Sequence, residues 1–121
     1  MTLKRKSPEA DFQKNLVDFI RLNAPKVIVF HPYNNGVNRN HQMKMKRLGV
    51  LAGIPDLVMI KPGGSVYLLE LKAGKGALMD SQKEIRDHCD HNGIPWASAR
   101  SYDEAIHWLN DWGLISARVA A

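Results

Sequence analysis

The chain has 121 residues with a formal charge of +5, from 17 Lys and Arg against 12 Asp and Glu, and a single cysteine. This length predicts one domain, residues 1–121 with a core at about 8–112, and one cysteine excludes an internal disulfide framework. No apolar stretch approaches the ~20 residues of a membrane span and no signal core is present, so we expect a cytoplasmic protein without a membrane partner. The positive charge favours polyanionic partners, but it is a weak signal alone.

The N-terminal quarter predicts a helix and then a short strand. Ser7-Pro8 is typical of an N-cap and first helical residue, and the helix should run to about Leu22. Glu9 falls on the same side of this helix as its apolar stripe, which is unusual for a carboxylate. From the helix alone, a first-turn glutamate stabilised by the helix dipole is the favoured explanation. Residues 27–31 predict the strand.

A polar, turn-rich stretch follows from Pro32 to Gln42, and the basic residues 43–48 are expected to form a turn or two of helix. This region is the best candidate for contacts with DNA phosphates, although a merely solvated basic segment explains it nearly as well. His31 and His41 flank the loop and are interpreted as ordinary polar residues rather than DNA contacts. The candidate DNA-binding residues are Asn35, Arg39, Lys44, Lys46, Arg47 and, further along the chain, Lys75.

Two apolar runs, residues 57–60 and 66–71, are joined by a Pro-Gly-Gly-Ser sequence and predict a β-hairpin buried on both faces. Asp56 directly precedes the first run, and Glu70 and Lys72 project from the same face of the second. Buried charges need partners, so these groups bind either a cation or one another. On spacing alone, a structural Glu70–Lys72 ion pair is the favoured interpretation.

The register of this hairpin decides whether the two carboxylates can meet. Simple pairing across a two- or four-residue loop would set Asp56 opposite Leu71, on the wrong face from Glu70. A shared site therefore requires a three- or five-residue loop, a bulge, or an Asp56 just outside the ladder.

The C-terminal part predicts a helix at about residues 80–92, with Gln82 in line with its apolar side, and a strand at residues 94–99. Ser101 should begin the last helix, with Glu104 completing a capping box. The expected fold is an α/β domain with one mixed β-sheet flanked by helices, in the order α-β-β-β-α-β-α.

The central motifs resemble the PD-(D/E)XK nuclease superfamily and, more closely, the virus-type replication–repair nuclease (VRR-NUC) family. Members carry an N-terminal helix with Glu and a nearby Phe-Gln, a Gly-x-Pro-Asp-Leu element, a Glu-x-Lys strand and a Gln in the following helix. The matching residues, in chain order, are Glu9, Phe12-Gln13, Gly53 to Leu57, Glu70 to Lys72 and Gln82. Where the family usually has Ser or Thr three residues before that Gln, this chain has Met79, so Asp80 or Ser81 is expected to cap the helix.

The resemblance implies a restriction-endonuclease-like fold and a Mg²⁺-dependent endonuclease, with Mn²⁺ as a substitute metal. Asp56 and Glu70 would be metal ligands, with the Leu71 backbone carbonyl as a third. Lys72 would position or activate the attacking water. Glu9 would reach the metal directly or through water, and Gln82 would support the site from its helix.

The compact members of the family also imply structure-selective cleavage of DNA, with four-way (Holliday) junctions as the substrate. Symmetric junction cutting requires two active sites, so a C2 homodimer is the coupled hypothesis. The alternatives are a monomeric flap or nicked-duplex nuclease and a non-catalytic DNA-binding module with the same fold.

Overall fold

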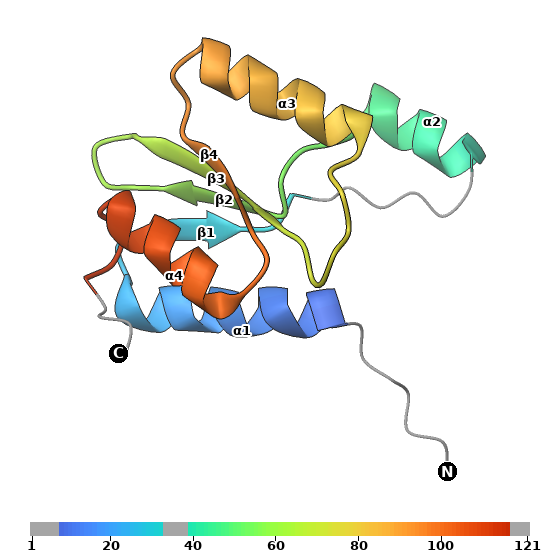
Figure 1. The fold of residues 1–121 in the computed structure, drawn as a ribbon. Helices are drawn as coiled ribbons and strands as arrows, with labels where there is room; N and C mark the ends of the chain where they lie inside the picture. Colours follow the sequence, from blue (N-terminus) through green and yellow to red (C-terminus); the bar gives the residue numbers. More distant parts are fainter. Residues whose placement is uncertain (1–7, 33–38, 117–121) are drawn as a thin grey trace.

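The computed structural model describes residues 8–32 and 39–116, which form one four-stranded mixed sheet with helices on both faces (Figure 1). The strand order is β1-β2-β3-β4, antiparallel except for the β3–β4 pair, which is parallel. The strands are β1 (Ile28–Phe30), β2 (Leu57–Ile60), β3 (Val66–Leu71) and β4 (Trp96–Ala99). The helices are α1 (Pro8–Asn23), α2 (Arg39–Arg47), α3 (Asp80–His91) and α4 (Tyr102–Asp111). The expected mixed sheet flanked by helices is confirmed.

The larger hydrophobic core lies between the sheet and the helices α1 and α4, which are drawn below the sheet in Figure 1. The apolar stripe of α1 enters it, as the spacing of that stripe predicts. Alternate residues of the strands meet the stripe from above because side chains on a strand alternate between its two faces. Among its fully buried side chains are Leu16, Ile20, Leu57, Met59, Leu69 and Leu109.

A smaller core lies on the opposite face, beneath α3. Its buried members are Val58, Leu68 and Cys89, with Ile85, Ile94 and Trp96 packed against them. This face of the sheet is where the charged residues of the hairpin project.

The hairpin between β2 and β3 closes through an odd-numbered loop. Leu57 pairs with Leu69, and the pairing continues past the strands, since the Lys61 amide donates to the Ser65 carbonyl at 2.8 Å. The Gly64 amide then donates to the Lys61 carbonyl at 2.9 Å, which leaves residues 62–64 as a three-residue loop. This register places Asp56, one residue outside the ladder, opposite Glu70. The condition for a shared carboxylate site is therefore met.

The helix α2 is longer than expected, since it begins at Arg39 within the stretch assigned to the polar loop. Residues 39–48 contain neither Gly nor Pro and several good helix formers, and Gly49, at φ +103°, follows the helix. Residues 33–38 of the same stretch lie outside the described part of the chain. Within the described ranges, no helix is both long and apolar enough to span a membrane.

Candidate active site

Glu70 is the centre of the site. The residue is only 3 % exposed, and it is the one charged residue buried within residues 9–32 and 40–116. Its neighbours Leu69 and Leu71 face the larger core, between the sheet and the helices α1 and α4. Because side chains alternate along a strand, Glu70 projects from the opposite face, toward α3. An ionised carboxylate in such a place requires a partner, because burial removes its hydration.

Asp56 meets Glu70 from the start of β2. The Leu71 amide donates to Asp56 Oδ2 at 2.8 Å, so the carboxylate of Asp56 reaches across to the end of β3. This hydrogen bond holds the side chain of Asp56 beside Glu70 rather than in solvent. The two carboxyl groups predicted to form a metal site are therefore brought together.

The proximity of the two carboxyls changes the pKa of Glu70. Burial, and then the hydrogen bond and negative charge of Asp56, raise the pKa of Glu70 to about 9. Lys72 acts in the opposite direction and lowers it, but less strongly. When both carboxyls are ionised, neither can donate a hydrogen bond, and Glu70 Oε2 has no hydrogen-bond partner among the described residues. With this pKa and no metal bound, Glu70 keeps its proton at neutral pH, and a cation could take the place of that proton.

Gln82 contributes from the first turn of α3. Its Nε2 donates to Glu70 Oε1 at 3.1 Å, and its Oε1 accepts from the Met79 amide at 2.8 Å. One side chain thus orients the buried carboxyl and caps the helix. The expected cap by Asp80 or Ser81 is wrong, because α3 begins at Asp80 and Met79 occupies the N-cap position. Gln82, at the N3 position, accepts from the N-cap amide as in one half of a capping box, and the Met79 side chain makes no cap hydrogen bond.

Gly53 sets the distance between the Asp56 segment and α3. A β-carbon at this position would lie 2.3 Å from the Ser81 carbonyl oxygen, and the residue has a φ of +83°. Both the close approach and the left-handed backbone conformation require glycine. Gly53 therefore lets the chain entering Asp56 lie directly against the turn of α3 that carries Gln82.

Lys72 and Glu9 lie at the margin of the pair. Lys72 follows β3, where its amide donates to the Ala99 carbonyl at 2.9 Å, and its side chain is half-buried. Glu9, in the first turn of α1, is exposed, and its charge makes the smallest contribution to raising the pKa of Glu70. Both charges therefore act on Glu70. Within the described ranges no group of three or more His, Cys, Asp or Glu side chains has the arrangement of a metal site.

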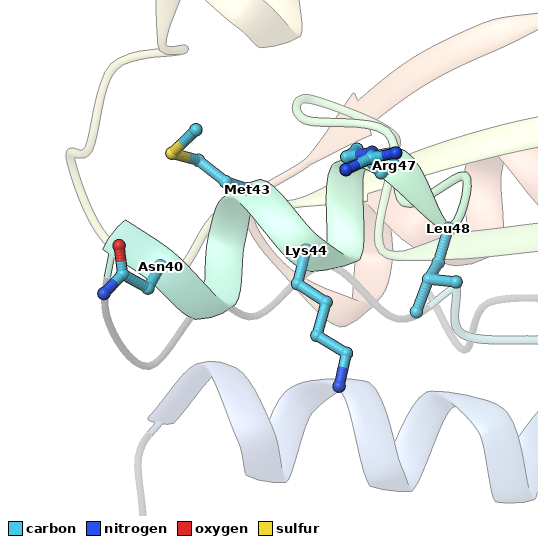
Figure 2. A pocket seen from close by; sticks show the side chains of 5 residues that line it. All are labelled: Asn40, Met43, Lys44, Arg47 and Leu48. Carbon is cyan, nitrogen blue, oxygen red and sulfur yellow. The ribbon is translucent and has the colours of Figure 1, made fainter.

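The candidate DNA contacts are concentrated on α2. This helix carries Lys44, Lys46 and Arg47 with exposed side chains and contains no acidic residue. An open hollow of about 500 Å³ runs along one side of it, and Figure 2 shows Lys44 and Met43 leaving the helix in different directions. The hollow is lined by Asn40, Met43, Lys44, Arg47 and Leu48.

The remaining candidates are more scattered. Lys75 is exposed in the segment that follows β3. Arg39 is the first residue of α2, and Asn35 lies outside the described residues.

One contact of the site was missed by sequence reasoning. His31, assigned to the ordinary polar residues of the loop, places Nδ1 2.6 Å from the backbone carbonyl oxygen of Asp56. The available signal was its position directly after β1, the strand that pairs with β2.

Taken together, the mixed sheet and the carboxyl pair at the end of its central hairpin define an α/β domain with a restriction-endonuclease-like fold. Among solved structures, the chain is similar to one described as a "VRR_NUC domain protein", with a TM-score of 0.69 over 90 % of each chain. The predicted VRR-NUC fold is therefore confirmed. Sequence identity to that structure is 20 %, so the likeness concerns the fold and leaves the chemistry to the site. No family model and no curated protein sequence matches the chain.

Proposed function

We propose that the protein is a metal-dependent DNA endonuclease, in which Asp56, Glu70 and Lys72 form the active site that hydrolyses phosphodiester bonds. The observation that carries the proposal is the buried carboxyl of Glu70, placed against Asp56 with an oxygen that lacks a hydrogen-bond partner among the described residues. A purely structural ion pair with Lys72 explains this site less well. The pKa of Glu70 stays near 9 despite Lys72, so the lysine alone does not keep the carboxylate ionised.

The donor set suits Mg²⁺ or Mn²⁺, because hard divalent cations prefer carboxylate, carbonyl and water oxygens. Asp56 and Glu70 would bind the cation, with the Leu71 carbonyl as a third ligand and Glu9 reaching it directly or through water. When bound, the cation would stabilise charge on the scissile phosphate and lower the pKa of a bound water. Gln82 would hold Glu70 in a fixed orientation, and Lys72 would orient the attacking water.

The exposed cations of α2 support a role in DNA binding. Lys44, Lys46 and Arg47 would contact phosphates, together with Asn35, Arg39 and Lys75. Contacts of this kind position a duplex without reading its sequence, which suits an enzyme that selects DNA by shape.

The proposed substrate is branched DNA, with four-way junctions cut by a homodimer that brings two copies of the site together. The second candidate is a monomeric nuclease that acts on flaps or nicked duplex. A single cut of this kind needs one active site, which one chain supplies. The molar mass at working concentration separates the two, because a monomer cannot supply paired cuts.

The test is a panel of labelled junction, flap, nicked and intact duplex DNA, incubated with Mg²⁺, with Mn²⁺ or with EDTA. We expect metal-dependent cleavage and none in EDTA. Asp56→Asn should abolish cleavage while DNA binding, measured by fluorescence anisotropy, remains close to that of the wild type. DNA binding without cleavage of any substrate in either metal would identify a non-catalytic binding module instead.

A further inference from the structure

His31 makes a hydrogen bond that no part of the proposed mechanism yet uses. Its Nδ1 lies 2.6 Å from the Asp56 carbonyl oxygen, while its side chain is otherwise exposed. A carbonyl oxygen only accepts hydrogen bonds, so the hydrogen must be on Nδ1 of the imidazole. His31 therefore donates to the main chain of Asp56.

The position of Asp56 explains why this bond matters. The β1–β2 ladder ends at the pair Phe30–Val58, and the β2–β3 ladder ends at Leu57–Leu69. Asp56 lies beyond both ladder ends. Its side chain is held by the Leu71 amide, and its carbonyl is held by His31. One bond comes from β3 and the other from the residue that follows β1, and together they restrain both the main chain and the side chain of Asp56.

We propose that His31 is a positioning residue, which fixes the main chain of Asp56 so that its carboxylate faces Glu70. The inference rests on the proposed function, in which Asp56 is a metal ligand. Groups that hold a metal-binding carboxylate from outside typically contribute about 10- to 100-fold to metal affinity. His31 is exposed, so its removal should affect the geometry of Asp56 more than the stability of the fold.

The variants that test this differ in one hydrogen bond. His31→Ala removes the donor, whereas His31→Asn keeps an N–H donor at about the same distance from the main chain as Nδ1. His88→Ala is the matched control, since His88 is exposed on α3. Asp56→Asn is the reference for a lost ligand, and thermal denaturation shows that each variant is folded.

The experiment measures Mn²⁺ binding by isothermal titration calorimetry in the absence of DNA. We expect His31→Ala to weaken binding at least about tenfold, with His31→Asn and His88→Ala close to wild type. Equal Mn²⁺ affinity of His31→Ala and wild type would overturn the inference and leave the proposed function intact. The same holds if His31→Asn binds Mn²⁺ as weakly as His31→Ala does. If wild-type protein does not bind Mn²⁺, the proposed function fails and the inference fails with it.

A second measurement does not depend on the metal. Long-range ¹H–¹⁵N spectra of the metal-free protein in alkaline buffer report which ring nitrogen of neutral His31 carries the hydrogen. The inference requires it on Nδ1. A hydrogen on Nε2 would overturn the inference whatever the result of the metal titration.

Discussion

The two faces of the central hairpin differ although the same two strands form them. On the face toward α1 and α4, the strand residues are apolar and enclosed by both helices. On the face toward α3, a single helix covers the smaller hydrophobic core, and Asp56 and Glu70 project from this same face. Leu69 and Glu70 are neighbours on β3, yet one lies in the core and the other in the candidate site.

The comparison indicates how a small domain can hold a buried charge. The larger core supplies most of the apolar burial and so most of the stabilisation. The α3 face contributes less, and its groups are fixed by hydrogen bonds instead: Leu71 amide to Asp56, and Gln82 to Glu70. We therefore expect apolar substitutions to lower stability more on the first face than on the second, and substitutions of the hydrogen-bonded groups on the second face to lower activity.

The largest expected effect is on cleavage by Glu70→Gln. The amide keeps the shape of the side chain but cannot bind a cation as a carboxylate does, so the rate should fall at least about a thousandfold, or roughly 4 kcal/mol. Initial rates with Mg²⁺ on the best-cleaved DNA substrate measure the effect. Glu84→Gln, which neutralises an exposed glutamate on α3, is the control and should leave the rate unchanged. Retention of activity within tenfold by Glu70→Gln would remove Glu70 from the site.

The next effect concerns the two cores. Leu69→Ala in the larger core should lower the free energy of unfolding by about 3 to 4 kcal/mol, because neighbours on both sides hold the cavity open. Leu68→Ala, one residue earlier and under α3, should cost about 2 kcal/mol. Urea denaturation of both variants measures the difference. Equal losses would show that the two faces stabilise the fold to the same extent.

A smaller effect is the response of the metal-free protein to pH. Folding raises the pKa of Glu70 from its ordinary 4.5 to about 9, so between these values the folded chain holds a proton that the unfolded chain has released. The free energy of unfolding should therefore fall as pH rises, with the contribution complete below about pH 4.5 and lost by about pH 9. Thermal denaturation in EDTA across this range should show a slope that Glu70→Gln flattens. Parallel slopes for the two proteins would contradict the raised pKa.

Much of the fold could be predicted because its signals are local. The bounds of β2 and β3 agree with the apolar runs, and Pro8 marks the start of α1 as its sequence context predicts. Ser101 accepts from the Glu104 amide at 3.1 Å, which confirms the cap of α4. Glu104 itself accepts from the Arg100 amide, one residue earlier than in a capping box. Apolar periodicity and capping residues act over a few positions and are visible in one sequence.

The rest depended on packing between distant segments. The loop sequence allowed both even- and odd-numbered loops, and the three-residue loop that forms brings Asp56 opposite Glu70. The contact of Gly53 with Ser81 and that of His31 with Asp56 join segments more than 20 residues apart, so no local pattern indicates them. The length of α2 was missed for another reason. The helix has few apolar residues, so it lacks the periodicity that identifies a helix packed on a core.

The smallest expected effects come from two helix-capping residues, Gln82 at the start of α3 and Ser101 at the start of α4, which lie on opposite faces of the sheet. Gln82→Ala and Ser101→Ala each remove a hydrogen bond to a backbone amide at the start of a helix, so each should cost about 1 kcal/mol of stability. Gln82 also donates to Glu70, whereas the hydrogen bond of the Ser101 side chain is to Glu104 of its own helix. We therefore expect cleavage to fall about tenfold or more in Gln82→Ala and to remain unchanged in Ser101→Ala. Rates compared at equal fraction folded test this. If the two variants cleave equally well, Gln82 serves only to cap α3, and the supporting role of this helix in the site is lost.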